Sequence, residues 1–315
     1  MATTGSPCQN RQAIQVRVPA FWTGKSKKGI SVLRKKSSAN KVLGILDLFT
    51  EESPAWTVDM LIKELNLTRA TTYRYVKALY DAGFIVPGAG SSYVLGPRFI
   101  QIDRQIMRSD PLLRAARPLL DSDRSKLIGA KILSGFYGDR VLSVHVEKND
   151  NDIALTMERG LSFPLIYGSP SQVILAYLPA YQLRNVYNAN AKLIAGQRLG
   201  DNWQEFRAEM KKIRKAGHRV GGHYQGSVIG VAAPIFHAPK AVSTSLCYVR
   251  SREICTDADI EKLVDLVTDT AAKISQELLS YKTEDGSMSP VFPSPRLAGQ
   301  QVFHDDDAQT ATAAT

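Results

Sequence analysis

The chain has 315 residues, 44% of them hydrophobic and 22% charged, which is an ordinary balance for a folded protein with a buried core. Its apolar stretches stay well short of the ~20 residues of a membrane span, and no apolar signal segment lies near the N-terminus. Three cysteines, Cys8, Cys247 and Cys255, have neither metal-ligand spacing nor a disulfide framework. We therefore expect a cytoplasmic protein that does not enter a membrane.

The net charge of +10 is spread unevenly along the chain. Residues 1–36 hold eight basic and no acidic residues, whereas residues 37–100 hold six of each. The first segment lacks periodicity, and we expect a disordered basic extension, a solvated tail in preference to an arm that follows DNA phosphates. Residues 283–315, rich in Gly, Ser and Pro and ending in QTATAAT, are expected to form a disordered tail.

The first helical signal covers residues 39–50, where apolar residues fall on one helix face before the break at Ser53-Pro54. Residues 57–86 then predict two short helices that are joined by a tight turn and followed by a strand. Residues that favour caps and turns mark the expected boundaries: Thr57, Asn66, Leu67, Thr68 and Gly83. This is the pattern of a helix-turn-helix.

The second of these helices has two chemically different faces. Its inward stripe follows helical spacing and consists of Thr72, Tyr75, Val76 and Leu79. Its outward face offers a small residue, an aromatic ring and two cations: Ala70, Tyr73, Arg74 and Lys77. Such a face suits the major groove of DNA, because basic and polar side chains can reach the base edges there. A helical hairpin used only for packing is the alternative, but it leaves the polar face without a role.

Residues 86–95 follow as two short apolar pieces around a glycine-rich tip, which predicts a β-hairpin beside the second helix. Helix, turn, helix and wing in this order favour a DNA-binding domain. The wing tip and the start of the second helix add further candidates. The candidate DNA-binding residues are Thr68, Arg69, Ala70, Thr71, Tyr73, Arg74, Lys77, Ser91 and Ser92.

Downstream, a helical segment begins after Gly96-Pro97, is interrupted at Asp110-Pro111 and resumes over residues 112–127. The rest of the chain predicts an antiparallel sheet with helices, an α+β arrangement. The expected strands cover residues 132–136, 141–146, 153–157, 220–224, 229–236 and 242–249. The expected helices are residues 169–178, a helix capped by Asp201 and ended by Gly217, and a last helix capped by Thr256.

Catalytic and metal-binding patterns are missing from the sequence. It contains no phosphate-binding glycine loop and no nucleophile-elbow serine, so we expect no enzyme and no cofactor. The five histidines do not pair at i, i+4, although His218 and His223 could meet across a strand and its turn. Satisfied or exposed histidines are commoner than ligands, so no metal site is expected.

Three separated stretches resemble the IclR family of transcriptional regulators. Residues 67–79 match the family's recognition-helix pattern, residues 93–96 match its wing exit, and residues 230–235 match a third motif, GVAAPI. The resemblance covers the chain from about Asn40 to Leu279. It implies an N-terminal winged helix-turn-helix domain over residues 37–96, a linker helix over 97–110, and a C-terminal GAF-like effector-binding domain with an antiparallel sheet over 111–282.

The same resemblance implies an effector site between the sheet and a loop with its following helix. The candidate ligand-binding residues are Gly160, Leu161, Gly168, Ser169, Pro170, Gln225, Gly230, Cys247 and Val249. Here the chain departs from the family: Gly230 replaces a frequent cysteine, and Cys247 and Val249 replace two serines. We therefore expect a roomier, more apolar pocket for a larger organic acid, aromatic or otherwise apolar, which Gly230→Leu should block. A degenerate pocket that binds nothing is the alternative.

The expected function is a ligand-responsive, DNA-binding transcriptional regulator. Its expected partners are a double-stranded DNA operator, a small-molecule effector and further copies of the same chain in a homodimer or homotetramer. An enzyme or a protein-interaction module with an appended winged-helix domain is the alternative.

Overall fold

The computed structural model of the protein describes residues 37–122, 129–137, 140–148, 157–223, 227–239 and 241–281. Within this part, the chain forms two units that join between Asp110 and Pro111. The expected basic extension, the C-terminal tail and the strand over residues 153–156 lie outside it. So do residues 123–127 of the helix that we expected to follow Asp110-Pro111.

The first unit contains four helices and a small antiparallel sheet among its described residues. The helices are α2 (Ser38–Leu46), α3 (Val58–Leu65), α4 (Arg69–Asp81) and α5 (Arg98–Ser109). The strands are β1 (Trp56–Thr57), β2 (Ile85–Pro87) and β3 (Ser92–Leu95), in the order β1-β3-β2, and a short 3₁₀ turn, Ala89–Ser91, forms the tip between β2 and β3. Their core consists of Ile45, Leu48, Phe49, Leu61, Tyr75, Val76, Leu79 and Ile85.

The helix boundaries of this unit follow from the residues that mark them. The side chains of Thr57 and Thr68 accept hydrogen bonds from the backbone N–H groups of Met60 and Thr71, so both threonines cap helices as expected. Asn66 ends α3 in the left-handed conformation, with φ 53°, which fixes the tight turn into α4. The expected helix-turn-helix is confirmed.

Some details differ from the sequence expectation. The first helix ends at Leu46, well before Ser53-Pro54, and a turn carries Leu48 and Phe49 into the core. Trp56 adds a strand that was not expected, and its indole N–H donates to the carbonyls of Leu48 and Ser53 at 2.9 and 3.1 Å. A two-residue strand is too short to produce a sequence pattern.

The second unit is built on a six-stranded antiparallel sheet in the order β6-β5-β4-β9-β8-β7. The strands are β4 (Ala130–Tyr137), β5 (Arg140–Lys148), β6 (Ser162–Pro164), β7 (Arg219–His223), β8 (Val228–Ala238) and β9 (Ala241–Ser251). The helices are α6 (Pro111–Ser122), α7 (Gly168–Ala176), α8 (Ala180–Gly196), α9 (Trp203–Ala216) and α10 (Asp257–Ser280).

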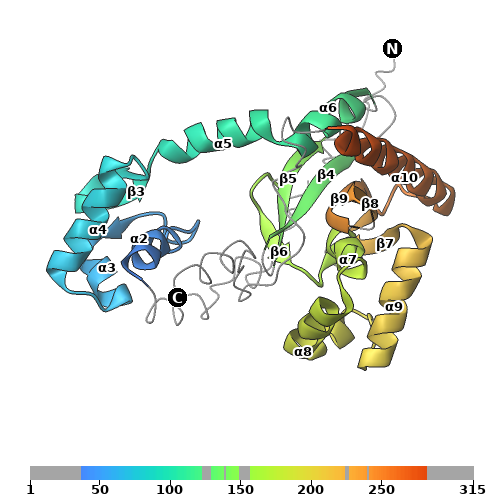
Figure 1. Ribbon diagram of the computed structural model, residues 1–315, viewed down its shortest axis with the longest axis horizontal. Helices are drawn as coiled ribbons and strands as arrows, with labels where there is room; N and C mark the ends of the chain where they lie inside the picture. Colours follow the sequence, from blue (N-terminus) through green and yellow to red (C-terminus); the bar gives the residue numbers. More distant parts are fainter. Residues whose placement is uncertain are drawn as a thin grey trace, which may run out of the picture. The chain divides into compact units, whose positions relative to one another are not determined.

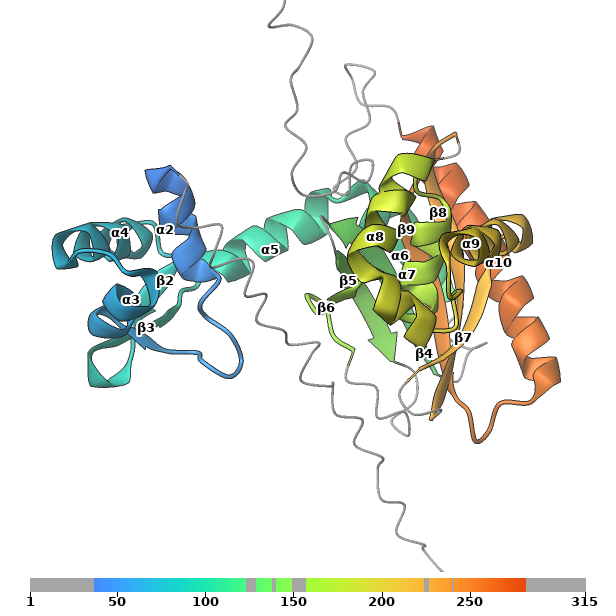
Figure 2. The ribbon, with the colours of Figure 1, turned by 90° about the horizontal axis from the view of Figure 1, so that it is seen from below.

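Helices cover both faces of this sheet (Figures 1 and 2). On one face lie α6 and α10, where the Tyr248 hydroxyl of β9 donates to Thr270 of α10 at 3.3 Å. On the other face lies α7, where the Ser245 hydroxyl of β9 donates to the Pro170 carbonyl at 3.1 Å. Alternate residues of β9 therefore point into two different layers.

The capping residues of the second unit were mostly foreseen. Thr256 forms a capping box with Asp259 at the start of α10, and Gly217 ends α9 with φ 73°. The cap of α9 is Asn202, however, because its side chain and not that of Asp201 accepts from the Glu205 backbone N–H. Within the described ranges, no helix is long and apolar enough to cross a membrane.

Candidate nucleic-acid interface and effector site

The second helix of the helix-turn-helix, α4, separates its buried and exposed faces as the sequence predicted. The inward stripe of Thr72, Tyr75, Val76 and Leu79 is buried. Ala70, Tyr73, Arg74 and Lys77 are exposed, and 49% of Tyr73 is accessible. The helix therefore presents a continuous polar surface whose side chains are not used for packing.

Two of the three cations on α4 have carboxylate partners. The Arg69 guanidinium lies 2.7 Å from Asp59 of α3, and the Lys77 ammonium lies 3.1 Å from Asp81. The Arg74 guanidinium instead lies 5.5 Å from the centre of the Tyr75 ring. Both ion pairs are exposed, so each holds its cation only weakly.

We expect Asp59→Asn to strengthen binding to non-specific duplex DNA. The substitution releases Arg69 from its partner, so one more cation can replace a counterion on a phosphate and the slope of log K against log salt should steepen by about one. The measurement is a salt titration of binding to a random duplex. The control, Glu64→Gln, removes an acid from the same helix without altering the Arg69 pair. An unchanged slope for Asp59→Asn would place Arg69 away from the DNA.

The remaining DNA-binding candidates lie at the start of α4 and at the wing tip. The hydroxyl of Thr68 donates to that of Thr71 at 2.9 Å, so both are engaged in the helix cap. Ser92 donates to the Ala89 carbonyl at 2.6 Å and so closes the wing turn, while Ser91 is exposed in a left-handed conformation. These hydroxyls fix the backbone at the start of α4 and at the wing tip, and Ser91 is the freer of the two wing serines.

In the second unit, the start of α7 packs directly on the sheet. The Ser169 hydroxyl lies 3.7 Å from the Cys247 sulfur, and both residues are buried. A Cβ atom added at Gly230 would come within 3.0 Å of Ser169 Oγ and 3.2 Å of Cys247 Sγ. The space that we expected beside Gly230 is thus filled by these two side chains, so the expectation of extra room there is wrong, and Gly230→Leu would disturb packing.

The Cys247 thiol is expected to be unreactive. It is 1% exposed, and burial raises its pKa to about 12 against the opposing effect of the hydrogen bond to Ser169. A thiol with so high a pKa stays protonated at neutral pH and is a poor nucleophile. Cys247 therefore contributes shape to this wall and not reactivity.

An unforeseen polar cluster fixes the middle of α7. The Arg219 guanidinium of β7 donates to the Gln172 side-chain oxygen at 2.8 Å and to the Glu209 carboxylate of α9 at 2.6 Å. Gln172 in turn donates to the Ile166 carbonyl at 3.3 Å. These contacts join α7 to α9 and β7, which lie more than 25 residues further along the chain, so no local pattern could predict the link to α7.

The other candidate ligand residues fall into two groups. The first group lies around Ser169, Gly230 and Cys247. It includes two residues in the first turn of α7, Gly168 and Pro170, and one sheet residue, Val249, which pairs with Gly230. Gly160 and Leu161 lie along β5, where both exchange backbone hydrogen bonds with Ser143. Gln225 lies outside the described residues.

Two of the described histidines contact nearby groups in the fold. His218 contacts the Ala216 carbonyl at 3.1 Å, and His237 contacts the Ser243 hydroxyl at 3.2 Å. Among the residues that the structure describes, no group of three or more His, Cys, Asp and Glu side chains could hold a metal ion.

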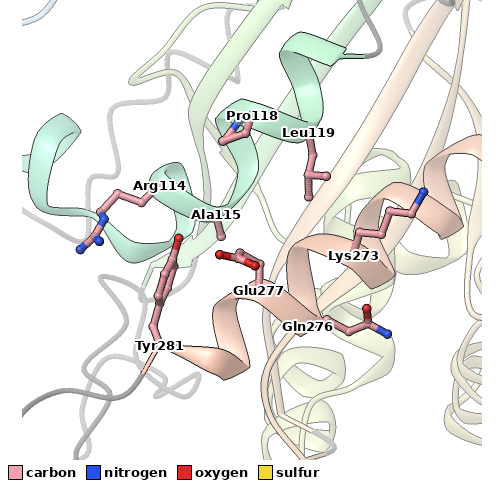
Figure 3. Close-up of a pocket in the computed structure, with 8 residues that line it drawn as sticks. All are labelled: Arg114, Ala115, Pro118, Leu119, Lys273, Gln276, Glu277 and Tyr281. Carbon is pink, nitrogen blue, oxygen red and sulfur yellow. The ribbon is translucent and has the colours of Figure 1, made fainter.

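A separate hollow of about 490 Å³ lies between α6 and α10 (Figure 3). It is lined by Arg114, Ala115, Pro118, Leu119, Lys273, Gln276, Glu277 and Tyr281. The Arg114 guanidinium lies 5.1 Å from the centre of the Tyr281 ring. Charged groups of both signs line this hollow, on the sheet face opposite α7, so it is a different surface from the wall around Ser169.

Comparison with known proteins identifies the family. The family model of the IclR helix-turn-helix domain matches residues 38–87, and the model of the bacterial transcriptional regulator IclR C-terminal domain matches residues 105–276. The chain belongs to the IclR family of transcriptional regulators. It is therefore a DNA-binding regulator with an effector-binding domain and not an enzyme.

Relatives of this IclR-family regulator align over nearly their whole length. The HTH-type transcriptional regulator KipR of Bacillus subtilis is 20% identical over 78% of this chain and 98% of its own. An IclR regulator from Alicyclobacillus acidocaldarius shares the fold with a TM-score of 0.66 at 19% identity, over 76% of this chain and 98% of its own. An IclR homolog from Microbacterium hydrocarbonoxydans, solved in complex with 4-hydroxybenzoate, has a TM-score of 0.63 at 17% identity, over 78% of this chain and 100% of its own.

Proposed function

We propose that this regulator acts in the cytoplasm, binds a partly palindromic DNA operator as a homodimer or homotetramer, and responds to a small organic acid with an apolar, aromatic body. The observation that carries the proposal is the exposed polar face of α4 opposite its buried stripe. The candidates Ala70, Tyr73, Arg74 and Lys77 would read the major groove from that face. The phosphates on either side of the groove would be contacted by residues at the start of α4 and at the wing tip: Thr68, Arg69, Thr71, Ser91 and Ser92.

Self-association is supported by α5. Each of its residues is at least partly exposed, although the helix carries large apolar side chains. Ile100 is 74% exposed and Ile106 37% exposed, whereas Phe99 packs against Phe84 with ring centres 5.3 Å apart. A second copy of α5 would cover the isoleucines, and a two-fold axis there would present two α4 helices to two half-sites.

The effector class is supported by the composition of the wall beneath α7. Gly230, Cys247 and Val249 offer no charged group, and Ser169 is occupied with Cys247. The remaining candidate ligand-binding residues are Gly168, Pro170, Gly160, Leu161 and Gln225. The relative from Microbacterium hydrocarbonoxydans was solved with an aromatic acid, 4-hydroxybenzoate, which is a ligand of the proposed class. The backbone N–H groups at the start of α7 would receive the carboxylate.

DNA footprinting tests the first half of the proposal. The regulator should protect two half-sites beside its own gene, about one helical turn or a multiple of it apart. Absence of any protected sequence at low salt, there and across the genome, would contradict the assignment of α4.

A thermal-shift screen of organic acids tests the second half. Aromatic acids should raise the melting temperature, because a ligand that binds only the folded state stabilises it by mass action. They should also change operator affinity, by their differential affinity for the DNA-bound and free forms. Shifts caused by short polar acids alone would contradict the proposed effector class.

A further inference from the structure

Three serines form a row across the sheet of the second unit. Ser134 of β4 is the register partner of Ser143 on β5 and also of Ser245 on β9. Residues directly opposite each other in neighbouring strands share one face of a sheet. Because the Ser245 hydroxyl donates to the Pro170 carbonyl, the shared face is the one that α7 covers.

A β-bulge brings Ser143 into this row. Leu133 pairs with His145, but the next residue of β4, Ser134, pairs with Ser143, so Val144 is the extra residue. With strict alternation, Ser143 would face the layer of α6 and α10 instead. The Arg159 guanidinium donates to the Val144 carbonyl and so holds the bulge. Bulges of this kind often re-aim side chains at functional sites.

The hydroxyls of the row are buried and incompletely bonded. Ser134, Ser143 and Ser245 are all 0% exposed. Within the described part of the chain, the hydroxyl oxygens of Ser134 and Ser143 have no hydrogen-bond partner, whereas Ser245 bonds to Pro170. A buried hydroxyl without a partner destabilises the fold, and alanine would fill the same place without that cost. Two neighbouring hydroxyls of this kind can each donate to and accept from a bound molecule.

The row connects the two separated groups of candidate ligand residues. At its β5 end, the Ser143 backbone exchanges hydrogen bonds of 2.8 and 2.9 Å with Gly160 and Leu161. At its β9 end, Ser245 bonds to Pro170 in the first turn of α7. Strands β5 and β9 are two strand spacings apart, or about 10 Å, which is comparable with the length of a small aromatic acid.

Apolar side chains border the row. One border is a buried apolar row that crosses β4, β5 and β6 through Phe136, Val141 and Phe163, which are register partners. On β4 and β5, this row lies two residues from Ser134 and Ser143. On the other side Ile132 pairs with Cys247. A polar strip between two apolar strips suits a ligand with an apolar body and a second polar group.

We propose that Ser134 and Ser143 bind a hydroxyl or similar hydrogen-bonding substituent of the effector, at the end remote from its carboxylate. This assignment rests on the proposed effector class and specifies it further. Each serine hydroxyl both donates and accepts, so the pair can satisfy a phenolic hydroxyl in both directions. The carboxylate then lies towards the first turn of α7, beyond Ser245.

The test compares two acids that differ by one hydroxyl, benzoate and 4-hydroxybenzoate. Their dissociation constants are measured by calorimetry on the full chain and on its Ser134→Ala and Ser143→Ala variants. The wild-type protein should bind 4-hydroxybenzoate more tightly, and each variant should lose about two- to tenfold in affinity for it, the value of one neutral hydrogen bond. Affinity for benzoate should not fall.

Melting temperatures without ligand provide the second readout. Both variants should melt at or above the wild-type temperature, because they remove an unsatisfied hydroxyl. The matched control is Ser243→Ala, which lies on the same strand as Ser245 and is equally buried but bonds to His237. It should lower the melting temperature and keep the preference between the two acids.

Two results would overturn the assignment in different ways. If the alanine variants melt lower and retain the preference for 4-hydroxybenzoate, the serines are satisfied by an internal water, and only this inference fails. If neither acid binds while the operator complex is intact, the proposed effector class fails, and the inference fails with it.

Discussion

Arg74→Ala is expected to weaken operator binding by about 1–3 kcal/mol and to relax specificity at one base pair. Arg74 lies in the middle of the exposed face of α4, and its guanidinium rests on the Tyr75 ring instead of on a carboxylate. It can therefore turn towards a guanine edge without breaking an ion pair. The measurement is a competition assay with operators that are substituted at each position in turn.

Lys77→Ala provides the matched comparison on the same helix face. The Lys77 ammonium is paired with Asp81 and the Lys77 side chain is 75% exposed, which suits a phosphate contact. Its loss should weaken all sequences alike and flatten the salt dependence by about one unit of slope. If Arg74→Ala left affinity and specificity unchanged while Lys77→Ala relaxed one base position, the reading side chain would be Lys77.

Gly96→Ala is expected to destabilise the DNA-binding unit strongly. An added Cβ would lie 2.2 Å from the Gly83 carbonyl oxygen, a rigid backbone atom at the end of α4. The Gly96 N–H also donates to the Phe84 carbonyl at 2.8 Å, so the two chain segments cannot separate without losing a hydrogen bond. Overpacking of this kind costs about 1–3 kcal/mol or more. Thermal unfolding followed by circular dichroism would measure the effect.

Gly90→Ala is the control for this substitution. Gly90 lies at the wing tip with φ 64°, and nothing lies within 4 Å of an added Cβ. Alanine there has only the unfavourable left-handed backbone, at about 1 kcal/mol. Equal melting temperatures for the two variants would mean that the wing exit can move away from the end of α4.

The structure explains why the sequence predicted the DNA-binding unit well. Its helices are short, α3 and α4 each start at a threonine whose side chain caps the first turn, and the buried stripe of α4 repeats at regular helical spacing. These signals are local, so the chain order alone reveals them. The first helix was placed too long because Leu48 and Phe49 continue the apolar pattern although they lie in a turn.

Helix α8 was missed for an equally specific reason. Its buried residues include Val186 and Ile194, but Asn190 between them has non-helical dihedral angles of −135° and 19°. Asn190 also occupies a position of the apolar stripe with a polar side chain, so the stripe is interrupted and neither half is long enough to give a helical signal alone.

The packing around the candidate effector residues was predicted less well because it depends on strand register. Gly230 suggested an open space, but the space is filled by Ser169 and Cys247, which come from other elements. Ser134 and Ser143 looked like ordinary strand residues, and only the bulge at Val144 brings their hydroxyls together. Register and bulges arise from pairing between distant segments, which the pattern of a single strand does not encode.

Lys131 has a consequence for how domains of this kind can be exchanged between proteins. Lys131 of β4 is 1% exposed, and its ammonium donates to the Leu120 carbonyl in the last turn of α6, with the Glu147 carboxylate 3.8 Å away. A buried charge that loses one of its partners is strongly destabilising. A chimera that joins a foreign DNA-binding domain after Ser122 would separate Lys131 from this helix, whereas a junction at Asp110-Pro111 keeps the Leu120 carbonyl of α6 as the hydrogen-bond acceptor of Lys131.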